Sequence, residues 1–307
     1  EANGDAWAVS PETYVSNGSF YVTEWVPGSH IMMSKNPNYW NADAIKLDKI
    51  KFNLMEDANA AYSAYQTGEV LLIKDVPTEE VPSLVGQADF HVEEIIGTYY
   101  ISLNLNEEFL KDVRVRKALS LAIDREHVAN TVMQGTYSAA YNFMGPGWTD
   151  ANGNEFMNKQ YISSDFAANL AEAKALLAEA GYPEGEGFPA FTYSTNEAGY
   201  HKPVAEYLQQ AWGELGIDVT VETVEWASFT PMRRNGEYMA ARNGWVGDYS
   251  DPSNMLELLY STNGNNDGKN DNGAFNGSMP MPPDGFKMSK NSENAGQNMP
   301  APTEFEN

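Results

Sequence analysis

Residues 112–126 read DVRVRKALSLAIDRE, and this stretch sets the fold that we expect for the chain. Val115 and Leu119 stand four residues apart, which is the spacing of one apolar face of an α-helix. Asp112 precedes the periodic residues and can cap the first turn with its carboxylate. We therefore predict a helix over residues 112–134.

Apolar patterning on both sides of this stretch alternates between helical and strand periods. On the C-terminal side, helices are predicted at 165–180 and 203–215, and strands at 191–194, 217–221 and 238–245. On the N-terminal side, strands are predicted at 21–26, 49–54, 70–73 and 91–105, with helices at 57–67 and 76–85. Pro27-Gly28 is a turn signal between the first strand and a second strand that is predicted to follow it within residues 17–40.

The composition describes an acidic globular chain. It has 307 residues, enough for about two domains, and 42% of them are hydrophobic. The formal net charge of −24 argues against nucleic-acid binding, which needs a basic surface, and disfavours docking on anionic membranes. The absence of cysteine excludes disulfides and thiolate metal sites.

The segment 242–252, RNGWVGDYSDP, has the residue types of a pocket floor. Its candidate ligand-contacting residues are Arg242, Trp245, Gly247, Asp248 and Tyr249. The two aromatic rings can form flat apolar walls, and the glycine allows a ligand to approach the backbone. Asp248 suits an ammonium group, and Arg242 suits a carboxylate. A ligand with both charges, such as a peptide, fits this set.

Six blocks of the chain, in order, resemble the solute-binding proteins of ABC transporters, family 5, the oligopeptide- and dipeptide-binding group. They are NGSFYVTEWVPGSHIMMSKNPNYW (17–40), GEVLLIKDVP (68–77), TYYISLN (98–104), DVRVRKALSLAIDRE (112–126), AKALLAEAGYP (173–183) and LGIDVTVETVEWASF (215–229). The 112–126 block is the most specific of them. In the second block, Leu71 or Leu72 stands where the family usually has aspartate. The resemblance covers about residues 12–262.

This resemblance implies an α/β fold of the type II periplasmic-binding-protein kind, in which two lobes close over a ligand. Residues 1–96 would form part of lobe I, and residues 97–262 most of lobe II. Compared with the family pattern, the chain resembles a fragment that lacks the family's opening stretch and closing helices. Residues 263–307 have low complexity, and their composition predicts disorder.

The function implied is that of the substrate-binding component of a bacterial ABC importer, which is not an enzyme. It would capture short peptides, deliver them to the permease subunits in the membrane, and act as a monomer without a cofactor. Its location would be the periplasm or the outer face of the cytoplasmic membrane, with a lipid anchor on the full-length protein as an open alternative.

The resemblance also implies roles for individual residues. Asp248 matches the aspartate that pairs with the α-amino group of a peptide. The peptide carboxylate would meet Arg242, Arg233 and His201, with Arg234 as an alternative to Arg233. The backbone of Trp245, Val246 and Gly247 would pair with the peptide as a neighbouring strand does. In some members, cysteines stand at the positions of Gly97 and Val246.

Several alternatives remain open at this point. Trp226 and Tyr100 are candidates for side-chain pockets, but either is equally well explained as core. The alternative interpretation of Asp248 is a turn residue, since Asp before Ser-Asp-Pro favours turns. Relatives bind oligosaccharides, nickel complexes or haem, so another solute is the second hypothesis. A third is a hydrolase that uses Asp248 and Asp251 as paired carboxylates, although Pro252 favours a turn role for Asp251.

Overall fold

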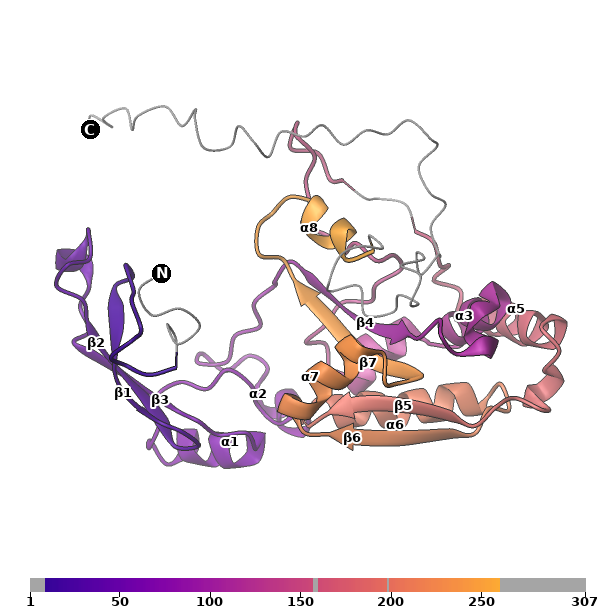
Figure 1. Cartoon of the computed structure of the whole chain (residues 1–307), viewed down its shortest axis with the longest axis horizontal. Coiled ribbons are helices and arrows are strands. Elements are labelled where there is room, and N and C mark those ends of the chain that lie inside the picture. Colours follow the sequence, from indigo (N-terminus) through magenta and orange to yellow (C-terminus); the bar gives the residue numbers. More distant parts are fainter. Residues whose placement is uncertain (1–8, 157–159, 198, 260–307) are drawn as a thin grey trace.

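The computed structural model describes residues 9–156, 160–197 and 199–259, and the 263–307 segment lies outside this description. Two separate β-sheets organise the chain (Figure 1). The three-stranded sheet and helix α1 lie at the left of the view, and the four-stranded sheet with its helices lies at the right. A connection with little regular structure joins them. None of the helices in the described ranges has the length and apolarity needed to cross a membrane.

The first sheet is an antiparallel meander in the order β1-β2-β3. Its strands are β1 (Phe20–Val26), β2 (His30–Lys35) and β3 (Lys49–Asn53). The turn between β1 and β2 uses Gly28 at a φ of 70°, a conformation that favours glycine. The turn signal and all three strands were therefore predicted from the sequence.

Short helical segments follow the first sheet. They are a 3-10 turn at Ala42–Ala44, helix α1 (Ala58–Gln66), a 3-10 turn at Thr78–Glu80 and helix α2 (Val81–Leu84). The strand expected at 70–73 is not formed. Leu71 and Leu72 are 91% and 82% exposed, and no described strand pairs with their backbone.

The second sheet is mixed and has the order β4-β7-β5-β6. Its strands are β4 (Gly97–Leu103), β5 (Phe191–Asn196), β6 (Val219–Val224) and β7 (Ala240–Val246). β4 runs antiparallel to β7, whereas β5 runs parallel to both β6 and β7. The strand expected over 91–105 is shorter, because only its residues from Gly97 onward pair with β7. Gly97 pairs directly with Val246.

Helices pack around this sheet and supply most of its core. They are α3 (Val113–Leu121), α4 (Arg125–His127), α5 (Phe166–Glu179), α6 (His201–Gly213), α7 (Trp226–Asn235) and α8 (Ser253–Leu256). 3-10 turns occur at Glu108–Lys111, Pro183–Gly185 and Glu257–Leu259, and a π-helical turn at Val128–Val132. The core centres on Trp212 of α6 and on Phe191 and Tyr193 of β5.

The helix expected over 112–134 is broken near Asp124. α3 ends at Leu121, and the Asp124 carboxylate accepts a hydrogen bond from the His127 backbone N–H at 3.0 Å, which caps α4. The periodicity of residues 112–126 does not reveal this break, because apolar spacing continues across it. An aspartate that prefers a capping position to a helix interior explains where the chain interrupts.

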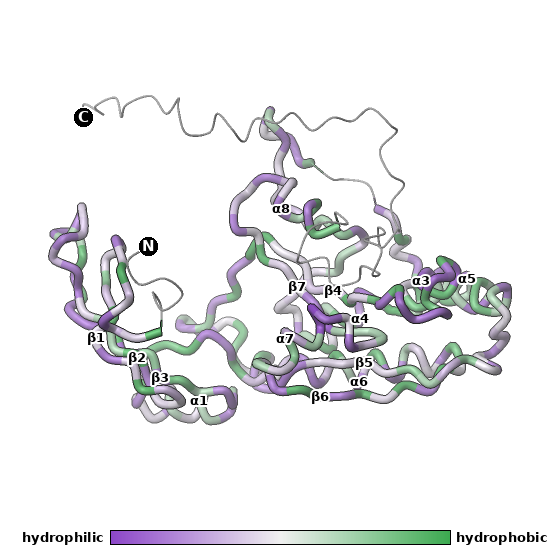
Figure 2. Tube along the Cα trace, in the orientation of Figure 1, coloured by the Kyte–Doolittle hydropathy of each residue, from purple (hydrophilic) through white to green (hydrophobic). Residues whose placement is uncertain are grey.

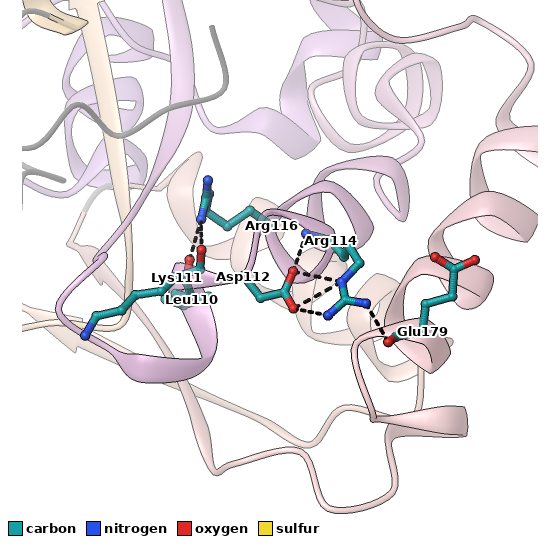
Figure 3. A network of polar contacts seen from close by, with 6 residues as sticks. All are labelled: Leu110, Lys111, Asp112, Arg114, Arg116 and Glu179. Atoms are coloured by element: carbon teal, nitrogen blue, oxygen red, sulfur yellow. Dashed lines mark hydrogen bonds and ion pairs between the residues drawn. The ribbon is translucent and has the colours of Figure 1, made fainter. Parts of the chain in front are cut away.

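A polar network ties the start of α3 to the end of α5 (Figure 3). Asp112 caps α3 by accepting from the Arg114 backbone N–H at 2.8 Å, and it also pairs with the Arg114 guanidinium at 2.6 Å. The same guanidinium donates to the Glu179 carbonyl oxygen at 2.7 Å. Arg116 donates to the Leu110 carbonyl oxygen at 2.7 Å. The charged residues of the 112–126 stretch thus fix helix ends rather than contact the candidate site.

Candidate ligand-binding site

The candidate site lies where the parallel strands β5 and β7 separate. The middle of β5 pairs with the first residues of β7, through Tyr193 with Ala240 and Ser194 with Ala241. Beyond Ala241, β7 has β4 as its sheet partner, and its other edge pairs with no described strand. Carboxyl ends of parallel strands are the usual position of ligands in α/β sheets.

Arg242 occupies this opening between two aromatic rings. Its guanidinium carbon lies 5.6 Å from the centroid of the Tyr99 ring and 5.8 Å from that of Trp226. Its Nε is buried without a hydrogen-bond partner among the described residues, and no described carboxylate forms an ion pair with it. A guanidinium in an aromatic setting without a counter-ion is suited to an incoming anion.

His201, at the start of α6, lies against the same aromatic group. It is only 1% exposed, and its Nδ1 shares a hydrogen bond of 3.2 Å with the Tyr99 hydroxyl. Burial, together with the positive charge of Arg242, lowers the pKa of His201 to about 3, so its imidazole is neutral at pH 7. Burial raises the pKa of Tyr99 to about 12. Arg242 therefore lies beside both Tyr99 and Trp226, and His201 contacts Tyr99.

Arg233 has a different environment from Arg242. It is half-buried, and its guanidinium donates to the carbonyl oxygen of Arg242 at 3.2 Å and to the side-chain oxygen of Asn243. Arg234 is exposed. Of these two neighbouring arginines, Arg233 is thus the one that faces β7, where it supports the backbone of the open strand edge.

The end of β7 forms the second part of the site. The Trp245 indole Nε1 donates to the Asn254 side-chain oxygen at 2.9 Å, and the Asp248 backbone N–H donates to the same oxygen at 3.0 Å. The Asp248 side chain is exposed, and its carboxylate has no hydrogen bond or ion pair with any described residue. Val246 and Tyr249 are 55% and 49% exposed. Asp248 is therefore accessible to a cationic group.

Gly247 meets a side chain of the protein rather than open space. A Cβ at this position would lie 2.6 Å from Cη2 of Trp148, which is itself only 1% exposed. A buried indole therefore fills the space where a side chain at this position would lie, and the approach of a ligand to the Gly247 backbone stays a prediction. Trp148 lies far away in the sequence, so no local pattern pointed to it.

Tyr100 and Tyr99 illustrate how strand alternation divides the aromatic residues. Neighbouring residues of β4 point to opposite faces of the sheet. Tyr99 lies beside Arg242, whereas Tyr100 packs edge-to-face on Phe143 with centroids 5.0 Å apart. The sequence analysis selected Tyr100 and missed Tyr99. The alternation of 98–104 was the available signal, but it does not tell which face meets the arginine.

Neither the metal nor the hydrolase hypothesis gains support from the described residues. Within the described ranges, no three His, Asp or Glu side chains gather closely enough to hold a metal ion. The Asp251 carboxylate accepts from the Ser253 backbone N–H at 2.9 Å, and the hydrogen bonds from Ser253 lower the pKa of Asp251. A general acid for glycoside hydrolysis needs the opposite shift.

Fold and site together describe an α/β protein with charged groups on and just after one sheet strand, β7. Comparison with known proteins gives the family: residues 1–267 match the model of the bacterial extracellular solute-binding proteins, family 5 Middle. The chain belongs to this family.

Relatives include the oligopeptide-binding protein OppA of Bacillus subtilis, 32% identical over 86% of this chain and 49% of its own length. The probable deoxycholate-binding periplasmic protein YgiS of Escherichia coli is 30% identical over 87% of this chain and 49% of its own length. The structure of Haemophilus influenzae OppA in complex with RPPGFSPFR matches with a TM-score of 0.73 and 28% identity, over 87% of this chain and 53% of that one. The chain thus spans about half the length of the relatives it matches.

Proposed function

We propose that this chain contributes to the substrate-binding component of a bacterial ABC importer and that its ligand is a short peptide. The observation that supports this most directly is the arrangement of charge along β7. An unpaired cationic group, Arg242, lies near the middle of the strand, and an exposed acid, Asp248, follows its end. A zwitterionic ligand in extended form matches this order.

The open edge of β7 suits the peptide backbone. Arg242 and Val246 are four residues apart, so their Cα atoms are separated by about 13 Å in a strand. Backbone pairing of this kind does not depend on ligand side chains, which permits peptides of varied sequence.

The individual residues would divide the work as follows. Asp248 would bind the peptide ammonium group, and Arg242 its carboxylate, with His201 and Trp226 at the side of the arginine. Arg233 would hold β7 in place for both. Each charge-assisted hydrogen bond would contribute roughly 1.5–3 kcal/mol where water is excluded.

The wider setting follows from the family. Residues 97–259 would form the peptide-binding lobe and residues 9–96 part of the opposing lobe, with closure of the two over the ligand. The complete protein would bind rather than catalyse, would act as a monomer outside the cytoplasmic membrane and would deliver peptide to permease subunits. The names of periplasmic relatives support this location.

The proposal is tested by titrating the 307-residue chain with a tripeptide in three forms: free, N-acetylated and C-amidated. Calorimetry or NMR chemical shifts measure the affinity for each form. We expect Asp248→Asn to remove the preference for the free amino end and Arg242→Met to remove the preference for the free carboxylate. Deoxycholate, which has a carboxylate but no ammonium group, is the control ligand. Any deoxycholate binding should depend on Arg242 and not on Asp248. Equal affinity of the wild type for all three tripeptide forms would refute the proposal and favour an oligosaccharide-type site.

A further inference from the structure

Asn254 is a buried polar residue to which the proposed peptide contacts give no role. It lies in α8 and is 1% exposed. Its side-chain oxygen accepts two hydrogen bonds, from the Trp245 indole at 2.9 Å and from the Asp248 backbone N–H at 3.0 Å. One acceptor therefore joins an aromatic wall of the site to the turn that carries the acid.

The position of Asn254 is itself fixed from two directions. Its backbone N–H donates to the Asp251 carbonyl oxygen at 3.0 Å, which closes the turn before α8. Its neighbour Met255 is fully buried in a small apolar cluster with Met144, Trp148 and Leu258, and Trp245 packs against this cluster. α8 has only four residues, so this packing rather than helix propensity must hold it.

We propose that Asn254 is a positioning residue that sets Trp245 and Asp248 as one unit and thereby determines the preference for a free peptide amino terminus. This inference rests on the proposed function. Asp248 follows the end of β7, and its carboxylate has no partner among the described residues. Its direction therefore depends on its backbone, which Asn254 holds. Preorganisation of this kind improves binding by reducing the ordering cost.

The experiment compares Asn254→Ala with Asn169→Ala in the 307-residue chain. Asn169 is a matched control, because it is 6% exposed and its side chain donates to the Ser163 carbonyl oxygen at 2.7 Å, in α5 and away from the site. The first quantity measured is the ratio of the dissociation constants of the N-acetylated and the free tripeptide. The second is the rate of solvent exchange of the Trp245 indole N–H, followed by NMR. The Trp245→Phe variant identifies the signal of this indole.

We expect Asn254→Ala to reduce the ratio of dissociation constants by about fivefold, which corresponds to the loss of one hydrogen bond of about 1 kcal/mol. The exchange of the indole proton should become faster. Asn169→Ala should lower the melting temperature but leave both quantities as in the wild type. Asn254→Asp retains an oxygen at the same position, so it should restore the slow indole exchange and most of the ratio.

Two results would overturn the inference: an unchanged ratio in Asn254→Ala, or equal losses in Asn254→Ala and Asn169→Ala. Failure of the proposed function looks different, because the wild type itself would then show no preference for the free tripeptide. Indole exchange is measured without peptide, so a loss of protection in Asn254→Ala would still establish the structural bridge in that case.

Discussion

The two sheets of this molecule both consist of paired strands, but they have very different cores. In residues 97–259, large side chains such as Trp148, Tyr193 and Trp212 are buried to 1% exposure or less. In residues 9–96, the buried apolar residues of the described chain are Ala64, Pro77, Val81 and Leu84, while Trp40 is 85% exposed. Figure 2 shows hydrophobic segments in both regions, so hydropathy does not distinguish them.

The difference teaches that correct strand register does not make a core. β1, β2 and β3 pair along their lengths, yet β1 and β3 leave Trp25 and Phe52 38% and 51% exposed. Three strands need a packed face to be stable on their own. The second sheet has such faces because helices cover it. Stability should therefore reside in residues 97–259.

The largest expected effect is in hydrogen exchange. Amides of β5 and β7 should open only with global unfolding, whereas those of β1 and β2 should open locally. We expect exchange in β5 and β7 to be slower by at least about a thousandfold, equivalent to about 4 kcal/mol. Mass-spectrometric or NMR exchange measures this. Equal protection in the two sheets would break the comparison.

The next effect concerns two tryptophans. Trp212→Ala removes a buried indole that also donates to the Leu119 carbonyl oxygen at 2.9 Å. It should lower the free energy of unfolding by about 3–5 kcal/mol. Trp40→Ala is the matched control in the first region. It should change the free energy of unfolding by less than about 0.5 kcal/mol. Urea titrations followed by circular dichroism give both values, and similar losses would contradict the contrast.

A smaller effect should appear in the pH dependence of stability. The pKa of His201 falls from 6.5 to about 3 in the folded chain, so the unfolded chain binds more protons between these values. The contribution of His201 to the free energy of unfolding is complete above about pH 6.5. It declines as the pH falls toward 3, by at most about 1.4 kcal/mol per pH unit.

His201→Gln should therefore flatten the slope of unfolding free energy between pH 6.5 and the acid limit of folding. The control is His30→Gln, which changes the first region, whose opening does not contribute to the main transition. Urea titrations at several pH values compare the three proteins. A slope that His201→Gln leaves unchanged would show that the imidazole is not held neutral.

The smallest effect compares two helix caps. Asp112 caps α3 and Asp57 caps α1, each by accepting from a backbone N–H. Asp112→Ala should lower the free energy of the main unfolding transition by about 1 kcal/mol, with little added by the partly exposed Arg114 pair. Asp57→Ala should leave that transition almost unchanged. Chemical denaturation measures the free energy of unfolding of both variants. Equal decreases for Asp112→Ala and Asp57→Ala would indicate that the two regions unfold together.

The sequence predicted much of the local structure and part of the site. α5 and β7 lie within about two residues of their expected bounds, because capping and strand patterns are local signals. Asp251 has the turn role that Pro252 favoured. The break at Asp124 was missed, since a cap inside a periodic stretch has the same apolar spacing as a continuous helix.

The sequence alone indicated most of the segments that become strands and helices, the family, and the candidate charged residues at 242 and 248, because these depend on neighbouring residues. Only the tertiary structure decided that Tyr99 rather than Tyr100 lies beside Arg242, that Trp148 fills the space at Gly247, and that Asn254 joins Trp245 to Asp248. Contacts of this kind join residues distant in the chain or on opposite faces of a strand, and periodicity does not encode which of them meet.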